Sequence, residues 1–210
     1  MSAEVVTPDY WEQACAHLMK KDRVMRRLVP KFAGVHLESR GDPFVTLARS
    51  IVGQQISVKA AQTVWDRFAT LLPQVTPARV LKLDVADLRG AGLSARKVEY
   101  IQDLAHHFLD KRANIKKWAD LGDEEIIAEL VAIRGIGRWT AEMFLIFHLM
   151  RPDVLPVDDV GLVNGVSKLY FSGEAVSRNE LREVAAAWAP YRSVATWYIW
   201  RSLEPEPVAY

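Results

Sequence analysis

The sequence of 210 residues lacks several features that define large classes of protein. Its single cysteine, Cys15, excludes an internal disulfide, a cysteine-ligated zinc site and a four-cysteine iron–sulfur cluster. No apolar run reaches the ~18 residues that a membrane span needs, and no apolar signal region follows the first Met. We therefore expect a soluble, intracellular protein, which in a prokaryote would be cytoplasmic.

A large excess of one charge is also absent, because 27 Lys and Arg face 26 Asp and Glu. Such a chain is not a general polycation, although a locally basic face that binds DNA is compatible with this balance. Half of the residues are hydrophobic and a quarter are charged, which excludes a disordered or collagen-like chain. The five histidines show no spacing typical of metal ligands.

Alternating strand patterns are missing as well, whereas apolar residues recur at helical spacing along almost the whole chain. The short apolar run Val154–Val157 contains Pro156 and is better interpreted as a loop. The sequence therefore predicts an all-α fold. Helices are expected to begin near Tyr10, Asp22, Asp42, Ser57, Ser94, Asp123, Gly137, Asp159, Ser177 and Pro190.

The first informative motif is LVAIRGIGRWTAEMF at residues 130–144, which predicts a helix, a tight turn and a second helix. Gly135 and Gly137 flank Ile136, which we expect to fill the core of this hairpin. Glycine permits unusual dihedrals and close approach, and N–H groups at a helix start favour a phosphate. An ordinary αα-hairpin that needs glycines to turn would explain the same residues equally well.

The second motif, VLPVDDVGLVNGV at residues 154–166, places two carboxylates at the start of a helix. The helix dipole favours the ionised form of a carboxylate in this position. Plain N-capping is the commonest use of Asp there. Since both Asp158 and Asp159 are available, one can cap while the other serves chemistry.

Together, Gly135–Ala141 (GIGRWTA) and Pro156–Gly161 (PVDDVG) resemble the helix-hairpin-helix DNA glycosylase superfamily, and within it the AlkA-like, 3-methyladenine DNA glycosylase II branch. The segments 48–57, 88–101 and 191–200 agree in order, so the resemblance runs from about Phe44 to Leu203. It implies a monofunctional enzyme that excises alkylated purines such as 3-methyladenine and 7-methylguanine. The implied partner is damaged double-stranded DNA, without a membrane, and we expect a monomer.

The resemblance assigns roles to individual residues. Asp159 would be catalytic, and Asp158 would be a neighbour that caps the helix or orients Asp159. It places the base pocket at Trp139, Trp200, Met143 and Val160, and DNA backbone contacts at Gly135, Gly137 and Arg138. It also places the side chain that fills the gap left by a flipped base at Gln54 or Gln55, where the AlkA type has leucine. No cofactor is required, but the main-chain carbonyls of Val131, Ile133 and Ile136 would hold a structural Na⁺ or K⁺ at the hairpin.

Two departures from relatives limit the chemistry. Trp139 stands where bifunctional relatives have a lysine nucleophile, so a covalent Schiff base has no evident donor. The lone cysteine also excludes the iron–sulfur cluster of the endonuclease III branch. Met143 and Val160 replace pocket aromatics of the AlkA type, which would alter the pocket or its range of lesions.

The expected architecture is two helical lobes with a cleft between them and without the N-terminal β-domain of the larger bacterial type. We expect residues 1–55 and 150–210 in one lobe and residues 56–149, with the hairpin, in the other.

Two other functions fit parts of this pattern. One is a noncatalytic helix-hairpin-helix DNA-binding protein, which would not need Asp159 or pocket tryptophans. The other is a glycosylase for oxidised or mismatched bases, which the missing lysine and cluster cysteines make a weaker match.

Overall fold

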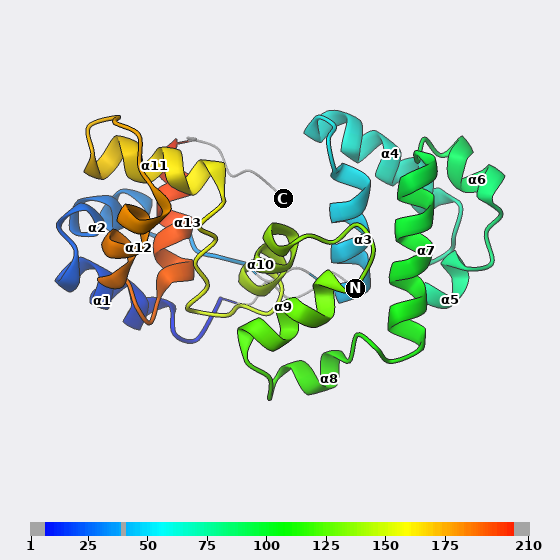
Figure 1. The fold of residues 1–210 in the computed structure, drawn as a ribbon, viewed down its shortest axis with the longest axis horizontal. Coiled ribbons are helices and arrows are strands. Elements are labelled where there is room, and N and C mark those ends of the chain that lie inside the picture. Colours follow the sequence, from blue (N-terminus) through cyan, green and yellow to red (C-terminus); the bar gives the residue numbers. More distant parts are fainter. Residues whose placement is uncertain (1–6, 39–40, 204–210) are drawn as a thin grey trace. The chain divides into compact units, whose positions relative to one another are not determined.

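The computed structural model describes residues 7–38 and 41–203, and within these ranges every regular element is a helix (Figure 1). The predicted all-α class is therefore confirmed. None of the helices in the described ranges is both long enough and apolar enough to span a membrane. The elements are α1 (Trp11–Lys21), α2 (Arg23–Leu28), η1 (Val29–Phe32), α3 (Pro43–Gly53), α4 (Val58–Thr70), α5 (Pro77–Val80), α6 (Val85–Gly90), α7 (Ala95–Leu109), α8 (Ile115–Trp118), α9 (Asp123–Val131), α10 (Arg138–Phe147), α11 (Val160–Tyr170), α12 (Arg178–Ala186) and α13 (Arg192–Leu203).

Side-chain caps begin most of the helices that the sequence predicts. The side chains of Asp42, Ser57, Ser94 and Ser177 each accept the amide N–H three residues later, at 3.0, 3.3, 3.2 and 3.3 Å. Such a bond satisfies one of the amide donors that a helix leaves unpaired at its start. The short polar residues before apolar periodic stretches are therefore helix caps, as predicted.

Four short elements were not predicted from the sequence: η1, α5, α6 and α8. Each has only four to six residues, which is too short for a helical period to show in the apolar pattern. The last predicted helix also begins at Arg192 rather than at Pro190, and α10 ends at Phe147 before a left-handed Met150.

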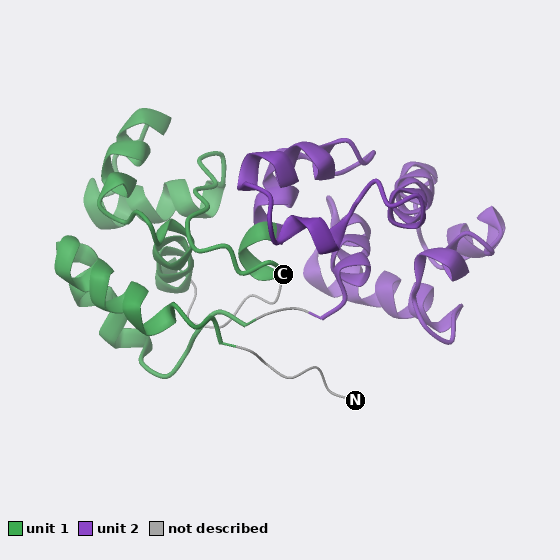
Figure 2. Ribbon diagram, turned by 90° about the horizontal axis from the view of Figure 1, so that it is seen from below, with its two compact units in different colours: residues 1–39, 145–210 green, residues 40–144 purple. Residues whose placement is uncertain are grey.

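The chain divides into two compact units, Met1–Ser39 with Leu145–Tyr210 and Arg40–Phe144 (Figure 2). In unit 1, α1 packs its Trp11 ring against Trp197 and Tyr198 of α13, with ring centroids 5.2 and 5.7 Å away. Helices α11 and α13 approach closely at Gly165, where an added Cβ would lie 2.2 Å from Ile199 Cγ2. Unit 1 thus combines helices from both ends of the chain.

One buried carboxylate links three parts of unit 1. Asp22 Oδ1 caps α2 by accepting the amide N–H groups of Val24 and Met25, at 2.7 and 2.9 Å. Its Oδ2 accepts the Tyr170 hydroxyl at 2.8 Å and the Trp188 indole N–H at 3.1 Å. Asp22 therefore holds the start of α2 against the end of α11 and the turn after α12.

The two units differ from the predicted lobes in the placement of α3. Residues up to 55 were expected with the chain ends, but α3 packs on α4 and α7 in unit 2. Its apolar face is fully buried there, and Phe44 contacts Phe108 of α7 with ring centroids 5.4 Å apart. Residues 145–149, expected with the hairpin, instead belong to unit 1.

Candidate active site and nucleic-acid interface

Asp159 lies at the N-cap of α11 in unit 1 and is buried. Its Oδ1 accepts the amide N–H of Leu162 at 2.6 Å. This bond and the positive end of the helix dipole favour a carboxylate that carries its negative charge. The aspartate is therefore held in place by backbone that its own helix supplies.

Trp200 of α13 provides a second donor to the same oxygen, with its Nε1 2.7 Å from Asp159 Oδ1. The indole ring also stacks on Phe147, with a centroid distance of 5.7 Å and an interplanar angle of 14°. Trp200 was predicted as an aromatic wall for the base. The structure adds that it positions the carboxylate.

Gly161, to which the sequence alone assigned no role, permits this hydrogen bond. A Cβ at this position would lie 3.1 Å from Asp159 Oδ1 and from Trp200 Cδ1. A side chain here would therefore press on both members of the pair. The sequence does contain a signal for this role, a glycine in the first turn of a predicted helix. Because glycine disfavours helices, its presence there indicates that another group packs closely against it.

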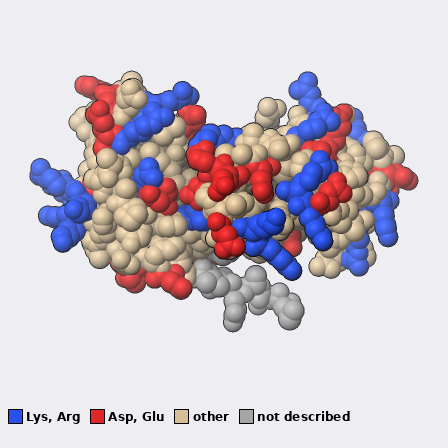
Figure 3. Space-filling model, turned by 60° about the horizontal axis from the view of Figure 1, so that its bottom comes forward, with Lys and Arg blue, Asp and Glu red and all other residues tan. Residues whose placement is uncertain are grey.

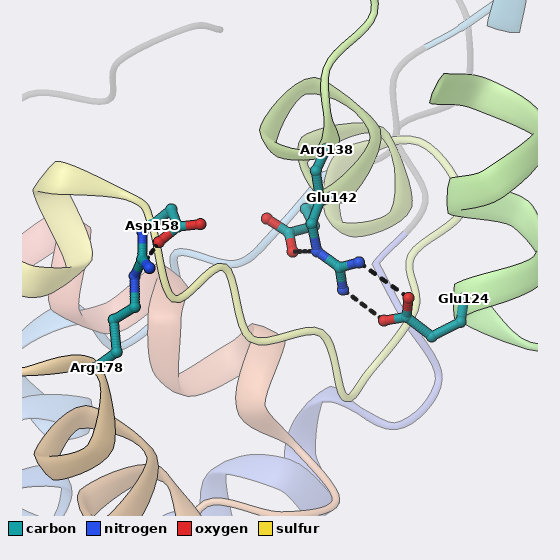
Figure 4. Close-up of polar contacts among 5 residues, drawn as sticks. All are labelled: Glu124, Arg138, Glu142, Asp158 and Arg178. Atoms are coloured by element: carbon teal, nitrogen blue, oxygen red, sulfur yellow. Dashed lines mark hydrogen bonds and ion pairs between the residues drawn. The ribbon is translucent and has the colours of Figure 1, made fainter. Parts of the chain in front are cut away.

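Asp158 does not cap the helix, so the first of the two roles predicted for it is wrong, whereas the second, orienting Asp159, stays a prediction. Its side chain is half exposed, and its Oδ1 pairs with Arg178 Nε at 2.5 Å (Figure 4). Asp159 takes the capping position because its oxygen is the one that reaches the Leu162 amide. Capping and the predicted chemistry thus fall on the same residue.

The four predicted pocket residues are divided between the two units. Val160 and Trp200 belong to unit 1, where Val160 is the first residue of α11 and is 71% exposed. Trp139 and Met143 belong to α10 of unit 2, where Trp139 is 42% exposed and Met143 is buried. Trp139 therefore offers an accessible aromatic surface.

The glycines of the hairpin between α9 and α10 serve different purposes. Gly135 has a φ of +84°, and a Cβ there would lie 2.2 Å from Tyr100 Cδ2, so the fold itself requires glycine. At Gly137 an added Cβ would meet no described atom within 4 Å. Ile136 is buried between them, as predicted. The fold thus explains Gly135 but leaves open space at Gly137.

Arg138, predicted to contact a phosphate, is held by two carboxylates (Figure 4). Its Nη1 and Nη2 donate to Glu124 of α9 at 3.0 and 2.5 Å, and its Nε donates to Glu142 of α10 at 3.0 Å. The hydrogen bonds from Arg138 lower the pKa of Glu124, and those to Glu124 raise the pKa of Arg138 further. A phosphate would have to compete with both acids for this guanidinium.

The structure distinguishes Gln54 from Gln55, which the sequence leaves as a pair. Gln54 Nε2 donates to the carbonyl of Gly135 at 2.7 Å, so this side chain ties the loop to the hairpin. Gln55 is exposed and has a φ of +60°, a left-handed conformation that is uncommon for a residue with a side chain. Gln55 is therefore the better candidate for the side chain that enters DNA.

Lys97 of α7, which the sequence alone did not mark as functional, supports the same loop. Its ammonium donates to the carbonyls of Val52 and Gln54 at 2.7 and 2.8 Å, which satisfies acceptors at the end of α3. Burial lowers the pKa of this ammonium. The only sequence signal was its place in the matching segment 88–101, because a lysine on a helix is normally solvated.

The chain belongs to the HhH-GPD superfamily of base excision DNA repair proteins, whose family profile matches residues 48–190. It is 34% identical to DNA-3-methyladenine glycosylase 1 of Schizosaccharomyces pombe, over 89% of this chain and 85% of that protein. The structure of the S. pombe 3-methyladenine DNA glycosylase in complex with abasic DNA matches with a TM-score of 0.76 and 33% identity, covering 90% of this chain and 96% of that one. A DNA-3-methyladenine glycosidase from Bacillus halodurans matches with a TM-score of 0.83 and 36% identity, covering 95% and 92%.

Proposed function

We propose that this protein is a monofunctional DNA glycosylase that removes alkylated purines, of the 3-methyladenine and 7-methylguanine type, from double-stranded DNA. The observation that carries this proposal is the buried Asp159 carboxylate, held by the Leu162 amide and the Trp200 indole. A protein that only binds phosphates has no use for such an arrangement. The compartment in which the enzyme works is then the one that holds DNA, the cytoplasm with its nucleoid in a bacterium.

The reaction would replace the bond from C1′ to the base nitrogen by a bond from C1′ to a water oxygen. The target nucleotide must first leave the helix, because its C1′ is out of reach in the stack. A purine alkylated at N3 or N7 is cationic, so it departs with the bonding electrons as a neutral base and needs no general acid. Asp159 would stabilise the oxocarbenium-like transition state and guide the water, whose proton passes to the carboxylate or to solvent.

Aromatic surfaces would bind the flipped base. Trp139 and Trp200 supply indole faces, which attract a cation more strongly than a neutral ring. The family resemblance also assigns Met143 and Val160 to base binding, where they would contribute apolar side chains. This environment favours a positively charged leaving base over a neutral one.

The hairpin and the loop after α3 would hold the DNA. We expect the amides of Gly135 and Gly137 to bind a phosphate, since the open space at Gly137 admits close approach of a backbone. Gln55 would occupy the gap left by the base. The carbonyls of Val131, Ile133 and Ile136 would bind Na⁺ or K⁺; Ile133 accepts the Ile136 N–H at 3.1 Å and keeps a second lone pair for a cation.

The test is base release from defined duplexes that contain 3-methyladenine, 7-methylguanine, hypoxanthine or 8-oxoguanine, followed by chromatography under single-turnover conditions. We expect the two cationic bases to be released much faster than the two neutral ones. The greater part of this difference comes from the lability of the cationic nucleoside, since a cation–π contact contributes only about 1–2 kcal/mol. Faster release of 8-oxoguanine would favour an oxidised-base glycosylase, and binding without any release would favour a noncatalytic DNA-binding protein.

A further inference from the structure

A group of cationic side chains on α1, α2 and η1 plays no part in the site described above. Over residues 20–31, the exposed positions are all Lys or Arg except Pro30. We call this surface the α1–α2 basic patch; it consists of Lys20, Lys21, Arg23, Arg26, Arg27 and Lys31. Figure 3 shows Lys and Arg gathered at its left edge, the side on which α1 and α2 lie, without acidic side chains among them.

The patch concentrates the positive charge of a nearly neutral chain. The sequence has 27 Lys and Arg and 26 Asp and Glu. Residues 20–31 contain six of these cationic residues but only one of the acidic residues. The remainder of the chain therefore has 21 cationic against 25 acidic residues. Residues 20–31 thus carry a net charge of +5 and the rest of the chain a net charge of −4, so the patch is a local site of attraction for a polyanion.

The single acid of this segment does not neutralise the patch by an ion pair. Both oxygens of Asp22 are directed inward, to the α2 amides and to Tyr170 and Trp188. Within the part of the chain that the structure describes, none of the six cations forms an ion pair. Arg26 alone makes side-chain hydrogen bonds, to the carbonyls of Met19 and Lys20.

Helix dipoles explain only some of these residues. Lys20 and Lys21 in the last turn of α1, and Arg26 and Arg27 in the last turn of α2, are stabilised by the negative helix ends. Arg23, by contrast, is the first residue of α2, where the dipole disfavours a cation. Lys31 follows α2 in η1. The patch thus contains more positive charge than local helix stability requires.

The patch is also distant from Asp159 within unit 1. The Asp22–Tyr170 hydrogen bond places the start of α2 beside the last residue of α11, and Asp159 caps the opposite end of that helix. Eleven residues of α-helix span about 16 Å. The patch is therefore a surface separate from the proposed catalytic residues.

We propose that the α1–α2 basic patch is a second DNA-binding surface, which contacts the sugar-phosphate backbone of duplex DNA away from the lesion. This rests on the proposed function, which supplies the polyanionic substrate. Arg23 and Arg27 lie one helical turn apart on the same face and can contact neighbouring phosphates. An acidic protein fits less well, because protein interfaces bury an apolar core and the exposed positions here are almost entirely cationic.

The test compares Arg23→Gln/Arg27→Gln/Lys31→Gln with a control of equal charge change, Lys82→Gln/Lys116→Gln/Lys117→Gln, in which all three lysines are exposed residues of unit 2. Affinity for a long undamaged duplex is measured against salt concentration. Each lost phosphate contact lowers the slope of log K against log salt by about 0.9, so the patch variant should lose about two to three units of slope. The control should keep the slope of the unaltered protein. Single-turnover base release at saturating protein should be unchanged in both variants.

An unchanged slope in the patch variant would overturn the proposal, and would leave an acidic protein as the partner of this surface. An equal loss in both variants would overturn it as well, because the effect would then be one of net charge alone. Circular dichroism and thermal unfolding check that both variants are folded. Since the binding assay uses undamaged DNA, it remains decisive even if the unaltered protein releases no base.

Discussion

The indole N–H of Trp200 donates to Oδ1 of Asp159 at 2.7 Å, the same oxygen that accepts the amide of Leu162. Two donors from different helices therefore fix one carboxylate oxygen. Gly161 makes the approach possible, because a side chain there would crowd both groups. A catalytic carboxylate benefits from such support, since a displacement of even an ångström weakens its effect on a transition state.

Asp159→Asn should lower single-turnover release of 3-methyladenine by roughly 10²-fold or more, because it removes the charge that faces the oxocarbenium ion. Asparagine is also a good N-cap, so thermal stability and DNA affinity should be preserved. The matched control is Asp158→Asn, which breaks only the exposed pair with Arg178 and should have little effect. A larger loss from the Asp158 variant would reverse the assignment.

Trp200→Phe should separate positioning from stacking. Phenylalanine retains an aromatic ring beside Phe147 but loses the N–H that binds Asp159. A hydrogen bond to a charged group contributes about 1.5–3 kcal/mol, so we expect the maximal single-turnover rate to fall at least tenfold. The protein concentration that gives the half-maximal rate should change little. Trp200→Ala should in addition weaken binding, and this loss should be larger for cationic than for neutral lesions. If Trp200→Phe and the unaltered enzyme release the base at equal rates, Trp200 has no positioning role.

Gln55→Ala should impair extrusion of the damaged base, because nothing would then fill the gap in the stack. The cost of unstacking is a few kcal/mol, so we expect a decrease of about tenfold or more in 2-aminopurine fluorescence enhancement next to the lesion site. Gln54→Ala, the comparison, removes the bond to the Gly135 carbonyl and should loosen the loop with a smaller effect. If Gln54→Ala has the larger effect, Gln54 is the inserted side chain.

The two hairpin glycines should respond differently to substitution. Gly135→Ala places a Cβ against the Tyr100 ring at a positive φ and should lower the melting temperature. Gly137→Val meets no described atom of the protein, so stability should change less, while the branched side chain should obstruct a phosphate. We expect the Gly137 variant to bind every duplex sequence more weakly, as measured by fluorescence anisotropy. Unchanged affinity in a folded variant would mean that the hairpin has only a structural role.

Turnover should produce no covalent intermediate, because the family resemblance places Trp139 at the position where bifunctional relatives have lysine. Borohydride added during the reaction should trap no protein–DNA adduct, and strand cleavage should require later alkali. A bifunctional glycosylase with the lysine serves as the positive control under identical conditions. A trapped adduct would show that another amine attacks C1′.

Much of the fold follows from the sequence because its signals are local. Asp42, Ser57, Ser94 and Ser177 cap helices as predicted, and each cap depends on an amide only three residues away. The placement of α3 was wrong because it depends on distant partners. The apolar stripe of α3 shows that one face is buried, but a stripe does not identify the helix that buries it.

In the candidate site, too, the features that depend on neighbouring residues could be predicted from the sequence, and those that depend on distant residues could not. The position of Asp159 at the start of a helix is visible in the sequence, whereas its bond to Trp200 joins residues 41 positions apart. The capture of Arg138 by Glu124 and the support of Gln54 by Lys97 also depend on tertiary contacts. Each of these charged side chains looks like an ordinary solvated residue of a helix when only its neighbours in sequence are considered.

The discontinuous construction of unit 1 has a consequence for synthesis on the ribosome. Residues 40–144 form one uninterrupted segment, and α1 and α2 are translated before it. The partners of Trp11 on α13, Trp197 and Tyr198, are translated after it. Trp200 also lies on α13, so a nascent chain already contains the entire hairpin while Asp159 still lacks its indole donor. A chain without α13 would contain the hairpin but would lack the indole donor of Asp159. If the proposed function holds, such a fragment binds DNA through the hairpin without a positioned carboxylate that releases the base.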